Sequence, residues 1–283
     1  MRWQGSRRSN NVEDYRGQRF GGPGLKLGVG GTLIALVAAY FLGIDPRVIL
    51  GLAQSVPAGG EQPAAQTGIP QDEEGQFISA VLGQTEDTWG AIFRTQGAEY
   101  EAPKLVLYSD QVQSACGFAS AAAGPFYCPG DRKVYIDLGF YRELGQQFQA
   151  PGDFAKAYVL AHEVGHHVQN LLGTAGKVRA AQERSSEQQQ NALQVRMELQ
   201  ADCYAGIWAK QADAEKHILE QGDIEEALRA ASSVGDDTIQ KRTRGVVVPE
   251  SFTHGSAQQR MTWFKRGFDG GTLESCDAFG AGA

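Results

Sequence analysis

The sequence predicts an α+β protein in which a single N-terminal transmembrane helix precedes a mostly helical domain with a small β-sheet. Three observations indicate this fold class. Residues 27–44 form an apolar stretch without a charged side chain. Apolar residues with helical spacing recur in several segments of residues 76–283. Two short runs, KLVLY and KVYID, have the composition and length of strands.

The N-terminal region predicts a membrane anchor. Residues 1–26 carry six basic and two acidic side chains and are expected to form a cytoplasmic tail. A helix over residues 27–44 would extend about 27 Å, close to the thickness of the hydrocarbon layer of a bilayer. The alternatives are a buried core helix, which the uniformly apolar character disfavours, and a signal peptide cut near Ala53 and Ser55, which the length disfavours. We therefore expect a single-pass membrane protein, held in the lipid bilayer by residues 27–44.

The rest of the chain is expected to lie outside the cytoplasm, in the periplasm or at the cell surface, because basic flanks stay on the cytoplasmic side. Residues 45–75 are rich in Pro, Gly, Gln and acidic residues and are predicted to be a flexible linker. Residues 76–283 have the length of one domain. The net charge of -7 argues against a nucleic-acid-binding protein, whose affinity depends on Lys and Arg contacts to phosphate.

The elements of this domain follow from periodicity and from capping residues. Asp153 can cap a helix that ends near Gly173, and Asp223 followed by Glu226 resembles a capping box. Turn signals rich in Gly and Pro separate the two strands. The predicted helices cover residues 75–96, 153–173, 188–212, a short stretch from 223, and 256–268, and the predicted strands cover 104–108 and 133–137.

Four cysteines allow three complete pairings. Cys116 and Cys128 flank a short glycine-rich loop, which leaves Cys203 and Cys276 as the second pair. Disulfides are favoured outside the cytoplasm, so we predict these two bridges. The alternative is that Cys203 is a small buried apolar residue of its helix.

The segment VLAHEVGHHV, residues 159–168, carries a candidate metal site. On a helix, His162 and His166 lie one turn apart on one face, so both imidazoles can bind a single ion, for which Zn²⁺ is suited. Glu163 is then expected to act as a general base toward a zinc-activated water and not as a ligand. His167 lies about 100° further round the helix and is expected to support the site or to pack. The alternative is a partly buried helix with solvent-facing histidines.

A catalytic zinc site with an open position needs a third protein ligand. The segment ELQAD on the next predicted helix offers Glu198, which would complete a His₂Glu site. Asp202, one turn later, is expected to accept the free N–H of a ligand histidine, that of His162 in first place. Ala201 lets the two helices approach closely. The alternative is a solvated acidic face, but the surrounding segment VRMELQADCYAGIWA is largely apolar, where acids need partners.

HEVGHH followed by ELQAD resembles the gluzincin metallopeptidases, in which a glutamate of an ExxxD segment on the following helix joins HExxH as a ligand. Over nearly its full length the chain is also similar to the bacterial neutral zinc metallopeptidases. The similar segments are MRWQGSRRSNNVEDYRG, the apolar stretch, CGFASAAAGPFYCP, VYIDLGFY, HEVGHHVQNLLG, RMELQADCYAGIWA and THGSAQQR. This resemblance implies a zincin-like fold, bound zinc and a membrane-anchored, peptidase-like domain.

Two residues near the C-terminus are further candidates. His254 precedes the last predicted helix and is a candidate donor to the oxyanion that forms during peptide hydrolysis. THGSAQQR also resembles a His-containing segment followed by Arg in some membrane-linked gluzincins. Arg260 is a candidate to bind an acid such as Asp202, or the substrate backbone. The alternatives are a loop histidine without function and a solvent-facing arginine.

The expected function is therefore hydrolysis of a peptide or protein substrate by zinc-activated water, with Glu163 as general base and His254 stabilising the oxyanion. By resemblance, KLVLY or KVYID would supply an edge strand on which an extended substrate lies. The alternative is a non-catalytic zinc-binding scaffold or interaction protein of the bacterial envelope with a zincin fold.

Overall fold

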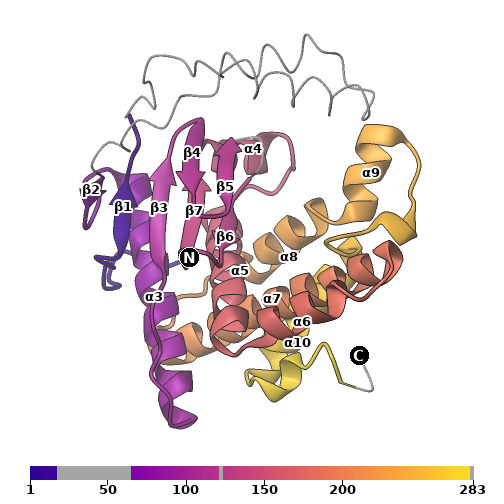
Figure 1. Cartoon of the computed structure of the whole chain (residues 1–283). Coiled ribbons are helices and arrows are strands. Elements are labelled where there is room, and N and C mark those ends of the chain that lie inside the picture. The colour runs from indigo at the N-terminus through magenta and orange to yellow at the C-terminus, as the bar shows by residue number, and fades with distance from the viewer. Residues whose placement is uncertain (18–64, 121–123, 281–283) are drawn as a thin grey trace, which may run out of the picture.

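A computed structural model of the chain describes residues 1–17, 65–120 and 124–280. Within these residues, five strands form one mixed sheet in the order β2-β1-β3-β7-β6, and β4 and β5 form a separate hairpin (Figure 1). β3 runs parallel to both β1 and β7, whereas β2 and β6 pair antiparallel at the two ends. The strands are β1 Val12–Asp14, β2 Gln66–Thr67, β3 Lys104–Tyr108, β4 Gln111–Ser114, β5 Gly117–Ser120, β6 Phe126–Cys128 and β7 Lys133–Asp137.

The helices gather mainly to one side of this sheet (Figure 1). α5 lies next to β6 and β7, and α7 packs against α5, with α10 packed against α7. The helices are α3 Glu73–Thr95, α4 Gly139–Gln146, α5 Asp153–Leu171, α6 Thr174–Gln182, α7 Glu187–Lys216, α8 Asp223–Ser233, α9 Asp236–Arg244 and α10 Ala257–Gly270, with short 3₁₀ turns η2 Pro249–Ser251 and η3 Glu274–Cys276. The predicted α+β class, mostly helical with a small sheet, is confirmed.

The two faces of the sheet bury different side chains, as the two-residue period of a strand requires. Leu105 and Leu107 of β3 join the main core between the sheet and the helices. Val106 and Tyr108, which point the other way, join a smaller core with Val112 of the β4–β5 hairpin. Two of the three interior strands of the five-stranded sheet, β3 and β7, match the predicted runs KLVLY and KVYID residue for residue.

The structure corrects the predicted membrane topology. Among residues 1–17, 65–120 and 124–280, no helix is both long enough and apolar enough to cross a bilayer. The predicted span, residues 27–44, lies outside the described residues. β1 precedes that stretch and β3 follows it, yet the two strands are neighbours in one sheet. A single crossing at 27–44 would place them on opposite sides of the bilayer, so the prediction of a cytoplasmic N-terminus with an extracytoplasmic domain is wrong.

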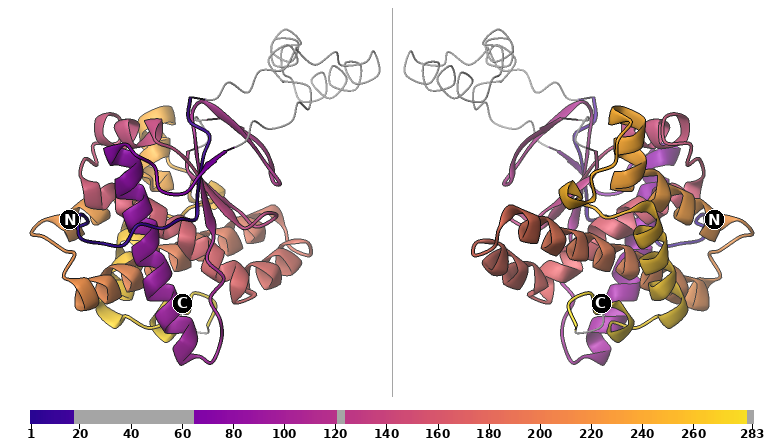
Figure 2. Two further views of the ribbon diagram at one scale, coloured as in Figure 1. Left: turned by 90° about the vertical axis from the view of Figure 1, so that its left-hand side faces the viewer. Right: turned by 90° about the vertical axis from the view of Figure 1, so that its right-hand side faces the viewer.

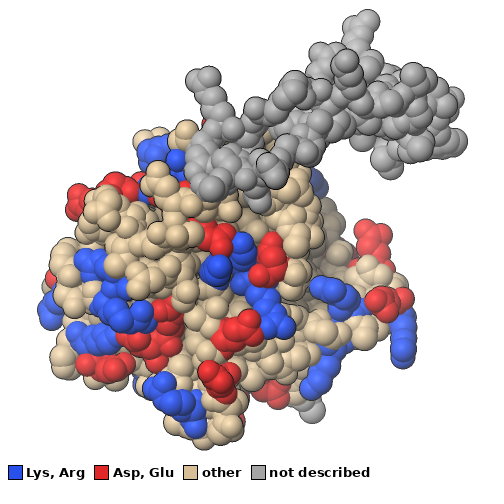
Figure 3. All heavy atoms as spheres, turned by 60° about the vertical axis from the view of Figure 1, so that its left-hand side comes forward, with Lys and Arg blue, Asp and Glu red and all other residues tan. Residues whose placement is uncertain are grey.

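Three of the basic side chains among residues 1–17, those of Arg2, Arg7 and Arg16, pair with acids. The Arg7 guanidinium lies 2.7 Å from Glu86 and 2.9 Å from Asp87, both on α3. Ser9 and Ser79 exchange hydrogen bonds, so the N-terminal segment runs along α3 (Figure 2). On the face of Figure 3, basic and acidic side chains are likewise mixed. Within residues 1–17, part of the positive charge that predicted a cytoplasmic tail is therefore used in local ion pairs.

The predicted linker over residues 45–75 includes ordered structure at its end. β2 and the first turn of α3 both lie within it, and residues 45–64 are outside the described part of the chain. Asp72 caps α3 by accepting a hydrogen bond from the Gly75 N–H. Arg16 binds the same carboxylate, and this hydrogen bond is the main reason that the pKa of Asp72 falls to about 2.

Disulfides join Cys116 to Cys128 and Cys203 to Cys276, the two pairings that the sequence analysis expects. The first ties the β4–β5 hairpin to β6, and the second ties α7 to the C-terminal segment at η3. We expect the unfolded, non-reduced protein to show no thiol reactive toward a chromogenic disulfide reagent, and the reduced protein to show four. Detection of two or four thiols before reduction would contradict one or both bridges.

Candidate metal centre

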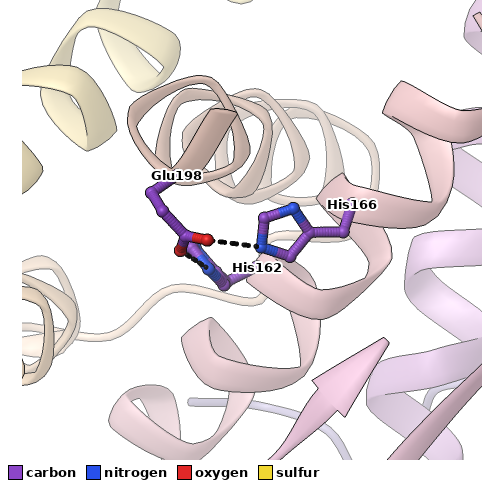
Figure 4. A group of neighbouring side chains, drawn as sticks. All are labelled: His162, His166 and Glu198. Carbon is purple, nitrogen blue, oxygen red and sulfur yellow. Dashed lines mark hydrogen bonds and ion pairs between the residues drawn. The ribbon is translucent and has the colours of Figure 1, made fainter. Parts of the chain in front are cut away.

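Three side chains of α5 and α7 converge on one point (Figure 4). One ligand atom from each of His162, His166 and Glu198 lies within 4.8 Å of the others. His162 Nε2 is 3.2 Å and His166 Nε2 is 3.6 Å from the Glu198 carboxylate. Two imidazole nitrogens and one carboxylate are a donor set that zinc accepts in catalytic sites. The three residues therefore fit the zinc ion that the sequence predicts.

The local sequence explains why two helices meet so closely here. His162 and His166 are separated by one turn of α5 and so share a face. Gly165 faces α7: a Cβ atom at this position would lie 3.0 Å from the Ala201 carbonyl oxygen and 3.3 Å from the Ala201 Cβ. A larger residue at either position would force the helices apart and move Glu198 away from the histidines.

Each of the three converging residues is held by a second polar contact. His162 Nδ1 lies 2.8 Å from Asp202, as the sequence predicts. His166 Nδ1 lies 2.9 Å from the Gln169 amide oxygen, and Gln194 donates to Glu198 Oε1 at 2.9 Å. The histidine contacts leave both Nε2 atoms facing the point of convergence. Gln169 and Gln194 are absent from the predicted site, although spacings of three and four residues along their helices could have revealed them.

Asp202 also forms a buried ion pair with Arg260 of α10. The carboxylate accepts from the guanidinium at 2.8 Å and 2.9 Å, and Tyr158 donates its hydroxyl proton to Asp202 at 2.5 Å. Burial raises the pKa of Asp202, but the charges of Arg260 and His162 outweigh it and hold the pKa at about 2. Arg260 thus takes the first of its two candidate roles, binding Asp202. The sequence reasoning did not select Tyr158.

The carboxylates make this point in the molecule favourable to a cation. Burial lowers the pKa of His162, but Asp202 and Glu198 outweigh it and raise the pKa to about 10. Glu198 is itself buried, with its pKa well below the usual range: burial opposes this shift, and the two histidines cause it. A metal ion would take the place of the proton that this potential favours on the imidazole.

Glu163 lies beside these residues in the wall of a cleft with a volume of about 670 Å³. Its carboxylate forms no hydrogen bond or ion pair with any described side chain, and it does not belong to the converging group. Aromatic side chains and residues of α6 form much of the remaining wall: Phe126, Tyr127, Phe140, Phe148, Ala175, Val178 and Arg179.

His254 reaches the same cleft from the loop before α10. The Asp236 carboxylate fixes this loop by accepting the backbone N–H groups of Thr253, His254 and Gly255 at 2.8, 2.6 and 2.9 Å. A hydrogen bond with Asp236 is the main cause of the raised pKa of His254, and burial opposes it. The His254 side chain is 52% exposed, so it remains accessible from the cleft. The sequence reasoning did not select Asp236.

The comparisons with known proteins identify the family of this chain. A model of the family described as "Putative neutral zinc metallopeptidase" matches residues 1–279. The chain belongs to this family. It is 48% identical to the uncharacterized protein YpfJ of Escherichia coli K12 over 289 residues, which cover 99% of each chain. It is 39% identical to the uncharacterized proteins Mb2605 of Mycobacterium bovis and Rv2575 of Mycobacterium tuberculosis H37Rv over 258 residues, 86% of this chain and 85% of theirs. No solved structure matches the chain.

In this family member, the edge strand nearest the centre is not one of the two predicted. KLVLY and KVYID are β3 and β7, which both have a neighbouring strand on each side. β6 ends the sheet on the side of α5, and its residues Phe126 and Tyr127 line the cleft. β6 was missed because three residues between Pro-Gly turn signals carry little strand pattern.

Proposed function

We propose that this protein is a zinc-dependent peptidase that hydrolyses peptide bonds in the cleft over α5. The observation that supports this most strongly is the convergence of His162, His166 and Glu198 beside the carboxylate of Glu163, which has no hydrogen-bond or ion-pair partner among the described residues. When bound by these three residues, zinc supplies a Lewis acid that activates water and polarises the carbonyl group of the substrate. The family description is consistent with this activity.

The chain's own residues account for the remaining steps. Glu163 takes a proton from the attacking water and delivers it to the nitrogen of the departing amine. Its carboxylate can do this because no described residue occupies it with a hydrogen bond or an ion pair. His254 donates a hydrogen bond to the oxyanion as negative charge develops on the former carbonyl oxygen. Asp202 holds the imidazole of His162 in one orientation, with Arg260 holding Asp202 in turn.

An extended substrate would add to the sheet at β6. This strand has no neighbour on its outer side among the described residues, and it lines the cleft that contains the catalytic groups. Backbone hydrogen bonds to such an edge hold any peptide, whereas side-chain pockets select among them. The aromatic residues of the cleft favour substrates with apolar side chains on that side.

The proposal is tested by the metal content and by cleavage of a mixed peptide library. We expect one zinc ion per purified chain, new peptide termini detected by mass spectrometry, loss of cleavage after treatment with a zinc chelator, and recovery when zinc is restored. Zinc at one per chain without any cleavage would favour a non-catalytic zinc protein. Cleavage that survives complete removal of the metal would exclude the proposed mechanism.

A further inference from the structure

His167, which the mechanism does not use, is fully buried on the side of α5 that faces the sheet. Its Nε2 atom lies 2.7 Å from the backbone carbonyl oxygen of Glu101, and its Nδ1 atom lies 3.1 Å from the hydroxyl oxygen of Tyr127. Tyr127 belongs to β6, and Glu101 belongs to the connection between α3 and β3. One imidazole therefore joins the zinc-binding helix to the edge strand and to a second segment beneath it.

The chemistry of these partners fixes the direction of every hydrogen bond. A carbonyl oxygen can only accept, so Nε2 of His167 carries a proton, and in the neutral imidazole Nδ1 then presents a lone pair. The Tyr127 hydroxyl donates to that lone pair, and it accepts in turn from the Asn170 amide at 3.1 Å. The hydrogen bonds therefore form one continuous chain, from the Asn170 amide through the Tyr127 hydroxyl and the His167 imidazole to the Glu101 carbonyl oxygen. Tyr127 and Tyr100 also contact the imidazole edge-on, with ring centroids 5.4 and 5.8 Å away.

We infer that His167 and Tyr127 are positioning residues that set the height of the edge strand β6 above the zinc-binding helix, and so determine how an extended peptide is held. This inference rests on the proposed function. β6 has three residues and, among the described parts of the chain, pairs only with β7, so its backbone pairing alone is a weak constraint. The hydrogen-bond chain attaches it to α5 one residue after the ligand His166. The same helix, α5, thereby positions both the metal ligands and the strand on which the substrate backbone would lie.

Tyr127→Phe tests this with a matched control in the same cluster. The change removes one hydroxyl group and keeps the ring. Tyr100→Phe removes a hydroxyl group that is buried without a hydrogen-bond partner in the described structure, from a ring that packs on the same histidine. For Tyr127→Phe we expect the KM for long peptides to rise about fivefold with kcat nearly unchanged, and a minimal single-bond substrate to be cleaved normally. We expect Tyr100→Phe to behave as the wild type.

Hydrogen exchange provides a readout that does not depend on activity. In Tyr127→Phe, the amides of β6 should exchange about fivefold faster, with zinc content unchanged. The amide of glutamine in His167→Gln can donate to Glu101 and accept from Tyr127. This variant should therefore keep most of the protection of the β6 amides that His167→Leu loses. Equal exchange and equal KM in Tyr127→Phe and Tyr100→Phe would overturn the inference. If the wild type cleaves no peptide, the proposed function fails, whereas faster β6 exchange in Tyr127→Phe alone would still establish the attachment.

Discussion

Glu163→Gln is expected to lower kcat for peptide hydrolysis by about 10²- to 10⁴-fold, the range that a general base contributes. Glutamine has the same size and can still fill the cleft wall, but its amide cannot accept the proton of the attacking water. Because Glu163 lies outside the converging group of His162, His166 and Glu198, the variant should retain one zinc ion per chain. The measurement combines initial rates on a peptide substrate with zinc analysis of the same sample.

Glu215→Gln supplies the matched control, since it removes one carboxylate charge from an exposed position of α7 far along the helix from Glu198. Its kcat and zinc content should equal those of the wild type. Retention of full activity by Glu163→Gln would exclude this carboxylate as the base. Loss of zinc together with activity would instead indicate that Glu163 is a metal ligand, contrary to the proposed arrangement.

Asp202→Asn is expected to reduce both stability and zinc affinity. Arg260 is 4% exposed, so the variant leaves a buried positive charge without its anion, at a cost of about 3–5 kcal/mol in the free energy of unfolding. The orientation of His162 is lost in the same step, which lowers zinc affinity about 10- to 100-fold. Denaturant unfolding of the metal-free protein measures the first effect, and competition with a zinc chelator measures the second.

The pH dependence of this effect has a defined sign. The folded pKa of Asp202, about 2, lies below the unfolded value. Its contribution to stability is therefore complete above about pH 4 and is lost as the pH falls through the folded value. The difference in the free energy of unfolding between the wild type and Asp202→Asn should therefore shrink as the pH falls below about 4. Asp269→Asn, which makes the same exchange at an exposed position of α10, should leave stability and zinc affinity unaltered; equal stability of the two variants would contradict the role of the buried pair.

The parts of the site that lie within one helix could be predicted from the sequence. The four-residue spacing of His162 and His166, and the same spacing of Glu198 and Asp202, each place two side chains on one helix face without any knowledge of the fold. Apolar periodicity similarly predicted the long helices. The role of Asp236 could not be predicted, because it depends on a turn 17 to 19 residues away that its carboxylate holds together.

The sheet was harder to predict because its order depends on distant pairings. β1 has the sequence VED, which carries no strand alternation, and its partners Leu105 to Leu107 lie far along the chain. The apolar stretch between them was a stronger local signal than either strand. The predicted membrane topology therefore rests on that stretch and its basic flank, and the pairing of β1 with β3, which contradicts it, is visible only in the folded chain.

The position of β1 matters to anyone who prepares this protein. A shortened version that starts after residue 64, chosen to remove the apolar stretch, would also remove the strand that covers β3. The backbone groups of Leu105 and Leu107, which now bind Asn11 and Tyr15, would then lie on an open sheet edge. Such an edge recruits strands from other copies of the chain, so the shortened version would tend to aggregate even though every residue of the zinc centre is present.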